Sequence, residues 1–146
     1  MRNIYILLPL TALLFSGCRI TQNVTPVELG VPIRKVYVLE NDEVLMEGLL
    51  GELLQQIRDN GIDAETYTGR RPVDAKHHVT YTANWAWDMA MYLTYFHITL
   101  YEGDRVIGEA DYDAKHGGAN MGKFGKTKEK IRPLLQELFE NVSRQK

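Results

Sequence analysis

The chain has 146 residues, of which 45% are apolar and 25% are charged, a mixture typical of one globular domain. Its formal net charge of -2 excludes the strongly basic surface of a nucleic-acid-binding protein, so we expect no nucleic-acid partner. Because Cys18 is the only cysteine, an intramolecular disulfide is also excluded.

The first 18 residues, MRNIYILLPLTALLFSGC, have the pattern of a secretory signal peptide. Arg2 is followed by an apolar run over 4–15 that is short for a membrane-spanning helix, and small residues come next. We therefore expect residues 1–17 to be a signal peptide that is cleaved between Gly17 and Cys18.

The end of this segment, LLFSGC, resembles a bacterial lipobox, with Phe15 where leucine is commoner. The resemblance implies a diacylglyceryl group on the thiol of Cys18 and an N-acyl chain, such as palmitate, on its amine. Several acyl chains make a firm membrane anchor. The non-acidic Arg19 then implies the periplasmic face of the outer membrane in a two-membrane bacterium. The alternative is an ordinary secretory signal with an incidental cysteine.

Residues 18–33 follow the signal and show no clear hydrophobic period. They contain Pro26, Gly30 and Pro32, so we interpret them as the lipidated N-terminus and a tether, part of which can add to the fold near 31–33. Residues 34–146 are then expected to form a single α+β periplasmic domain.

This domain is predicted to begin with a strand, a helix and a second strand. RKVYVLE, over 34–40, is a β-branched and aromatic run typical of a strand. A helix follows, with Asn41 or Asp42 as its cap and Asn60-Gly61 as its end. AETYTG, over 64–69, is the second strand, which we expect to pair in parallel with the first.

Two predicted helices carry apolar stripes at helical spacing. The first stripe comprises Met46, Leu49, Leu50, Leu53 and Ile57, and the second, within 127–142, comprises Ile131, Leu134, Leu135, Leu138, Phe139 and Val142. Gly48 and Gly51 are expected inside the first helix, where it approaches the sheet closely. Thr127 is expected to cap the second helix.

The aromatic segment HVTYTANWAWDMAMYLTYFHITLYE, over 78–102, alternates between apolar and polar residues and is predicted to form strands rather than a membrane span. Its alternation changes phase between Trp85 and Thr94, which one regular strand cannot do. We therefore predict a hairpin with its turn at Trp87-Asp88.

A third strand, RVIGEADYD, over 105–113, completes the predicted meander. A three-residue loop over 102–104 would keep one face wholly apolar. It would pair Leu100 with Val106, Ile98 with Gly108, and Phe96 with Ala110. Glu109 would then lie beside His97 and Asp111 beside Tyr95, while the small residues Gly108 and Ala110 would leave room for helix side chains.

The expected fold class is α+β: a two-layer sandwich in which a mostly antiparallel sheet of about five strands has two helices on one face. The second face of the sheet has no predicted cover. It would present a partner-binding set of residues: Tyr95, His97, Thr99, Tyr101, Glu109 and Asp111.

Candidates for other chemistry have weak patterns. NMGKFGKT, over 120–127, has Asn120 where a phosphate-binding loop requires glycine. His77 and His78 are adjacent in a strand and would point to opposite faces, so they do not suggest a metal site. No nucleophile with a base is apparent. We therefore expect no enzyme activity, no metal and no cofactor apart from the lipid on Cys18.

The lipobox, YTANWAWDMAMYLTYFHITLYE, GEADYDA and KIRPLLQELF together resemble a family of small uncharacterised bacterial outer-membrane lipoproteins. The order of a βα unit and a meander is also similar to envelope domains of secretion and cell-wall accessory lipoproteins. The resemblance implies an envelope location but no catalytic residues.

The expected function is that of a non-enzymatic, lipid-anchored lipoprotein that presents its domain to a protein or complex of the cell envelope. The alternative is a binding module for a small apolar or glycan ligand, held between the sheet and the 114–125 loop.

Overall fold

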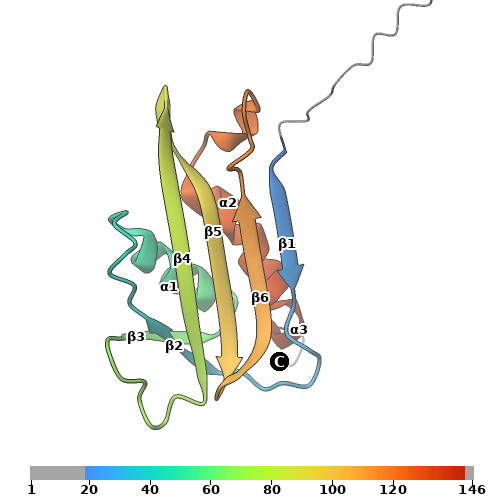
Figure 1. The fold of residues 1–146 in the computed structure, drawn as a ribbon. Helices are drawn as coiled ribbons and strands as arrows, with labels where there is room; N and C mark the ends of the chain where they lie inside the picture. The colour runs from blue at the N-terminus through green and yellow to red at the C-terminus, as the bar shows by residue number, and fades with distance from the viewer. Residues whose placement is uncertain (1–18, 144–146) are drawn as a thin grey trace, which may run out of the picture.

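The computed structural model describes residues 19–143, and the predicted signal peptide and Cys18 lie outside these residues. Six strands, a 3-10 turn and three α-helices follow one another along the described part of the chain, which makes the fold α+β as expected (Figure 1). The elements are β1 (Thr21–Thr25), β2 (Lys35–Leu39), α1 (Leu49–Asp59), β3 (Asp63–Tyr67), β4 (His77–Asp88), β5 (Ala90–Glu102), β6 (Arg105–Asp113), η1 (Met121–Lys123), α2 (Thr127–Leu138) and α3 (Glu140–Ser143).

The strands form one mixed sheet in the order β1-β6-β5-β4-β2-β3. Neighbours from β1 to β4 are antiparallel, whereas β2 pairs in parallel with both β4 and β3. The parallel pairing of β2 and β3 around α1 is confirmed. The prediction of about five, mostly antiparallel strands did not include β1 or the parallel pairing of β2 with β4. The prediction of two helices did not include the short α3.

The additional strand, β1, lies in the segment that we expected to be a tether. It pairs along its whole length with β6, from Thr21 opposite Asp113 to Thr25 opposite Glu109. Farther along, Val27 and Ile33 are buried in the core. Residues 21–25 are therefore part of the sheet, and the ordered domain begins before residue 34.

The first helix begins later than predicted. Gly48 precedes it with a φ of 82°, in the left-handed region that an α-helix cannot use. Asn41 does not cap the helix, because its side chain accepts a hydrogen bond from the backbone N–H of Glu43 and donates one to the carbonyl of Tyr81. Gly51 has open space where a Cβ would lie, so the predicted close approach to the sheet at Gly48 and Gly51 is wrong.

The second helix buries the predicted stripe. Its residues Ile131, Leu134, Leu135 and Leu138, together with Phe139 and Val142 beyond its end, are all in the core. Thr127 is the first residue of α2 and Lys126 occupies the N-cap position, so the prediction that Thr127 caps this helix is wrong. The hydroxyl of Thr127 instead accepts a hydrogen bond from Trp85.

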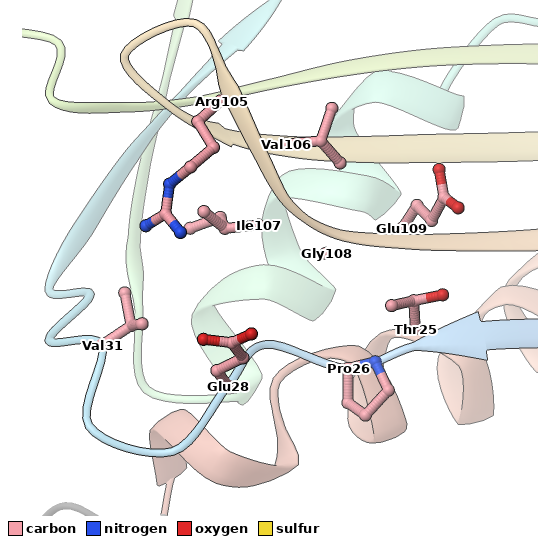
Figure 2. Close-up of a pocket in the computed structure, with 9 residues that line it drawn as sticks. All are labelled: Thr25, Pro26, Glu28, Val31, Arg105, Val106, Ile107, Gly108 and Glu109. Carbon is pink, nitrogen blue, oxygen red and sulfur yellow. The ribbon is translucent and has the colours of Figure 1, made fainter.

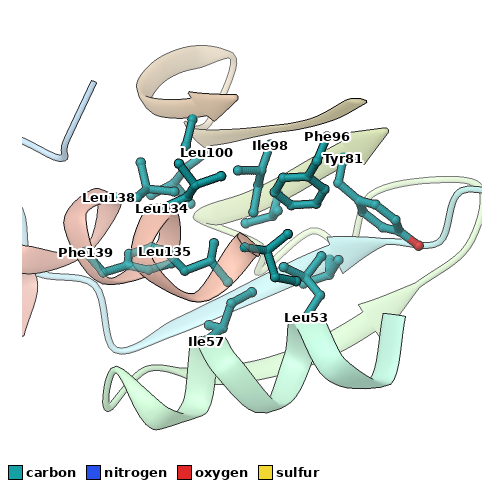
Figure 3. Close-up of a cluster of buried hydrophobic side chains, with 14 of the residues drawn as sticks. Leu53, Ile57, Tyr81, Phe96, Ile98, Leu100, Leu134, Leu135, Leu138 and Phe139 are labelled. Carbon is teal, nitrogen blue, oxygen red and sulfur yellow. The ribbon is translucent and has the colours of Figure 1, made fainter. Parts of the chain in front are cut away.

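Both long helices pack against the same face of the sheet (Figure 1), where their side chains meet those of β4 and β5 (Figure 3). Gln56 of α1 is buried and donates hydrogen bonds to Glu52 and to the carbonyl of Lys128 in α2, which joins the two helices. At Gly108, a Cβ would lie 2.9 Å from Cδ1 of Leu138. The prediction that Gly108 leaves room for the helix is therefore confirmed.

Residues 77–102 form the predicted hairpin, although its turn is at Met89, one residue past the predicted turn. Met89 has a φ of 62°, which is uncommon for a residue other than glycine. The register between β4 and β5 shifts at Asn84/Trp85, and this irregularity is the physical cause of the phase change in the sequence.

The register between β5 and β6 differs from the predicted one by two residues. Glu102 pairs with Arg105 across a two-residue turn, and a bulge follows between Leu100 and Tyr101. The resulting pairs are Leu100 with Gly108, Ile98 with Ala110, Phe96 with Tyr112, His97 with Asp111, and Thr99 with Glu109. Side chains alternate between the two faces of a strand, so a register shift of two residues leaves the same residues on the apolar face, which was predicted correctly. Val106, however, is exposed rather than in the core.

Candidate functional site: the open face of the sheet

The second face of the sheet carries none of the described helices over strands β4, β5, β6 and β1 (Figure 1). The predicted partner-binding residues all belong to this face, because they alternate with core residues along β5 and β6. We call it the open face. It comprises His78, Thr80, Thr82, Asn84, Tyr95, His97, Thr99, Tyr101, Glu109, Asp111, Asp113, Thr21, Asn23 and Thr25.

Aromatic rings lie along the centre of the open face in two stacked pairs. The rings of Tyr95 and His97 are nearly parallel, with centroids 6.4 Å apart, and Nζ of Lys115 lies 3.8 Å from the centroid of the Tyr95 ring. The ring of Tyr101 stacks on that of His78, with centroids 4.7 Å apart. Tyr95, His97 and Tyr101 are half-buried and His78 is buried, so the rings are held in place before any partner arrives, which lowers the entropy cost of binding.

Thr99 lies at the centre of the face but is only 7% exposed. Its Oγ1 is 3.0 Å from Nε2 of His97, so the hydroxyl orients the imidazole ring. We had expected Thr99 to be open to a partner. The structure shows that it supports His97 instead.

A row of carboxylates on β6 borders the aromatic rings. Glu109 is exposed, Asp111 accepts a hydrogen bond of 2.9 Å from Asn23 of β1, and Asp113 is 3.5 Å from Nζ of Lys115. Three carboxylates against one ammonium give this part of the face a formal charge of -2 with histidine neutral. Such a surface suits a partner that offers cations or hydrogen-bond donors.

A polar cluster closes the other end of the face, near the turn between β5 and β6. Nη1 of Arg71 donates hydrogen bonds to the carbonyl of Gly103 and to Asp104, and it lies 3.5 Å from Nδ1 of His78. Burial lowers the pKa of His78, and the guanidinium of Arg71 lowers it further. Both effects favour the neutral form of the imidazole beneath Tyr101.

Several residues of this face could not be assigned to it from the sequence. Asn23 and Thr25 belong to β1, whose sequence TQNVT has one apolar residue and no detectable period. The sequence predicts only that His77 and His78 point to opposite faces of the sheet. The stacking of His78 on Tyr101 depends on the register between β4 and β5. The alternation of polar residues along one strand predicts which side chains share a face of the sheet. Which residues of the next strand lie beside them is determined only by the register of the two strands.

A small cavity lies at the edge of the sheet, between β6 and the segment after β1 (Figure 2). Its volume is about 160 Å³, and Pro26, Glu28, Val31, Arg105 and Ile107 are among the residues that line it. Pockets for small-molecule ligands usually have about 300–1,000 Å³. The cavity is thus suited to water or a single small group.

The region between the sheet and the 114–125 loop, where the alternative prediction placed a ligand, is occupied by protein side chains. Lys123 is 4% exposed, and its Nζ donates to Asp88 and to the carbonyl of Gly118. Its ammonium lies 5.0 Å from the centroid of the Tyr92 ring, and Tyr92 packs edge-on against Phe124. This network holds the loop against the β4–β5 hairpin.

A second buried lysine lies beneath this loop. Lys130 donates a hydrogen bond to the carbonyl of Lys123, its Nζ lies 5.3 Å from the centroid of the Tyr112 ring, and burial lowers its pKa. Within residues 19–143, no three His, Cys, Asp or Glu side chains gather in a group that could hold a metal ion. No helix in the same range is long and apolar enough to cross a membrane.

The fold is shared with solved structures, although no protein-family model and no curated protein matches the chain. It is similar to the PelC dodecamer from Paraburkholderia phytofirmans, with a TM-score of 0.55 and 10% sequence identity. A PelC variant dodecamer from the same organism gives a TM-score of 0.55 at 11% identity. Each match covers 86% of this chain and 98% of the other. At this identity the likeness concerns the fold alone.

Proposed function

We propose that the protein is a non-enzymatic lipoprotein of the cell envelope, anchored by lipid on Cys18 at the periplasmic face of the outer membrane. Its domain binds an envelope protein through the open face. The observation that carries the binding proposal is the two pairs of stacked rings, Tyr95 on His97 and Tyr101 on His78, on a sheet face that none of the described helices covers.

The chemistry of the face indicates the kind of partner. Rigid tyrosine rings supply contact area at a low entropy cost, and tyrosine is enriched in protein–protein interfaces. The carboxylates Glu109, Asp111 and Asp113 add acceptors along one side. The partner surface is accordingly expected to present arginine, lysine or backbone N–H groups.

Crosslinking in cells tests this proposal. A photo-crosslinking amino acid at His97, near the centre of the face, should capture a specific protein in the envelope fraction. The same amino acid at Gln136, an exposed residue of α2 on the helical side, is the matched control. Equal crosslinking patterns at the two positions would contradict the proposal.

A second copy of the chain is one candidate for the partner. The two PelC structures of similar fold are dodecamers, which motivates a test of self-association. Multi-angle light scattering of the purified protein should then give a mass above that of one chain. A monomer at all concentrations would leave a different envelope protein as the partner.

The alternative function, a module for a small apolar or glycan ligand, has less support from the geometry. The space next to the 114–125 loop holds Lys123 and Phe124, and the cavity beside β6 has a volume of only about 160 Å³. Native mass spectrometry that showed a co-purified ligand would favour this alternative.

A further inference from the structure

Four large apolar side chains project into solvent at one end of the molecule. They are Trp87, Met89 and Met91 at the tip of the β4–β5 hairpin, which are 71%, 84% and 53% exposed, and Met121 of η1, which is 73% exposed. These four make up half of the eight exposed large apolar residues in the described part of the chain. We call them the apolar tip. An exposed apolar cluster of this kind marks a contact surface.

The apolar tip extends beyond the rest of the sheet. The last row that crosses four strands joins Asn84, Tyr95, Asp113 and Thr21. From Asn84 the hairpin continues for four residues to Asp88, which at about 3.3 Å per residue is roughly 13 Å. Figure 1 shows this hairpin end projecting past the neighbouring strands.

The tip is also held in position. Thr94 donates a hydrogen bond to the carbonyl of Asn84 at the base of the projecting part. Nearer the turn, Asp88 is paired with Nζ of Lys123 at 2.5 Å, and Lys123 belongs to η1 together with Met121. The hairpin and η1 therefore present their apolar side chains as one unit.

The start of the described chain lies at the same end of the molecule. β1 begins at Thr21, in the last full row of the sheet, and the backbone N–H of Arg19 donates to the carbonyl of His116. A Cβ at Gly122 would lie 3.6 Å from Cδ1 of Ile20, so Ile20 is adjacent to η1. Cys18 immediately precedes Arg19, and consecutive Cα atoms are about 3.8 Å apart, so a lipid on Cys18 would be attached next to this end of the molecule.

We propose that the apolar tip inserts into the interface of the lipid leaflet that holds the acyl chains of Cys18. This inference rests on the proposed lipid anchor. Tryptophan is favoured at membrane interfaces because its ring is apolar and its N–H is polar, and methionine adapts to irregular apolar surroundings. The exposed cations Arg19 and Lys126 near this end favour anionic headgroups.

Insertion would give the anchor an orientation. Acyl chains on one residue hold a domain at the membrane but leave it free to rotate, whereas a second contact fixes its tilt. The strands would then stand steeply on the leaflet, and the open face would be directed sideways, parallel to the membrane plane. A partner in the periplasm could reach it without contacting lipid.

Tryptophan fluorescence can test the insertion directly, because Trp85 and Trp87 are the only tryptophans. Trp85→Phe leaves Trp87 as the sole emitter, and Trp87→Phe is the matched control that leaves the half-buried Trp85. Each lipidated protein, with acylation verified by intact mass, is placed in vesicles of phosphatidylethanolamine and phosphatidylglycerol with brominated acyl chains. Trp87 should shift its emission to shorter wavelength and lose most of its intensity, while Trp85 should change little.

A second arm separates failure of the tip from failure of the anchor. The chain from Cys18 onward contains the whole described fold, and its thiol can be coupled to a maleimide lipid in the same vesicles. If the cellular protein carries no lipid, the proposed anchor is wrong, but quenching of Trp87 in this arm still supports insertion. Emission from Trp87 that iodide quenches and brominated lipid leaves unchanged would overturn the inference.

Discussion

Nζ of Lys123, in the 3-10 turn before α2, lies 2.5 Å from Oδ2 of Asp88, one residue before the turn of the β4–β5 hairpin. The lysine side chain is 5% exposed and the aspartate side chain 53% exposed, so the pair joins a buried cation to a half-exposed anion. It fixes the hairpin end to the segment that leads into α2. Together with the contacts of Tyr92 with Lys123 and Phe124, it holds the two parts of the apolar tip in position relative to each other.

Asp88→Asn should therefore destabilise the protein, because the buried ammonium of Lys123 loses its carboxylate. We expect the free energy of unfolding to fall by about 1–2 kcal/mol. This loss is at the lower end of the range for hydrogen bonds between charged groups, because water screens the half-exposed Asp88. Urea unfolding measures this change. Asp104→Asn, in a side chain 94% exposed and paired with Arg71, is the control and should change stability by less than about 0.5 kcal/mol.

Two glycine-to-alanine substitutions should have opposite effects. At Gly108 a Cβ would lie 2.9 Å from Leu138 and 3.2 Å from the carbonyl oxygen of Thr25, so Gly108→Ala should cost about 1–3 kcal/mol. At Gly51, inside α1, the Cβ would meet open space, and Gly51→Ala should stabilise by about 0.5–1 kcal/mol. Thermal unfolding of both variants checks the signs, and equal effects would show that the packing at Gly108 is not as described.

The segment around β1 should matter for stability if it belongs to the domain. Val27 is fully buried, its N–H donates to the carbonyl of Leu138, and its own carbonyl accepts from Asn141. Val27→Ala should lower the free energy of unfolding by about 1–3 kcal/mol. Leu29→Ala, two residues along and 71% exposed, is the matched control with little expected effect. Equal free energies of unfolding for the Val27→Ala and Leu29→Ala proteins would instead indicate that this segment is a tether.

Stability should fall as the solution becomes mildly acidic. His77 and His78 are 4% and 8% exposed, and burial is the largest cause that lowers each pKa. The unfolded chain protonates near the ordinary histidine pKa of about 6.5, so below this pH it binds more protons than the native state. The free energy of unfolding should therefore decrease from about pH 7 downward, until the lowered native pKa values are passed.

His78→Phe isolates one of these contributions. A phenylalanine ring can retain the stacking on Tyr101 but does not titrate, so the slope of stability against pH should become smaller. Chemical unfolding at several pH values measures this slope. The control is His116→Asn, at an exposed position in the loop after β6. A wild-type slope in the His78→Phe protein would contradict the role assigned to His78.

Local patterns in the sequence determined which residues face the core. Helical spacing identified Leu53 and Ile57 of α1 and the whole stripe of α2, and the phase change near Trp85 identified the hairpin. These predictions succeed because burial of one face imposes a period on the residues of a single element. The lipobox resemblance at Cys18 is likewise a local pattern, and it lies outside the described residues.

Contacts between elements were decided by the tertiary structure. β1 has one apolar residue and forms a strand because its backbone pairs with the edge of β6, which the hydrophobic pattern of its own sequence does not indicate. The register of β5 and β6 is two residues from the predicted one, since such a shift leaves the same residues on the apolar face. The proximity of Ile20 to η1, and with it the common location of the start of the described chain and the apolar tip, depends on both pairings. The sequence pattern predicts whether each residue is buried or exposed. Which residues distant in the sequence contact it is determined by the alignment of the strands.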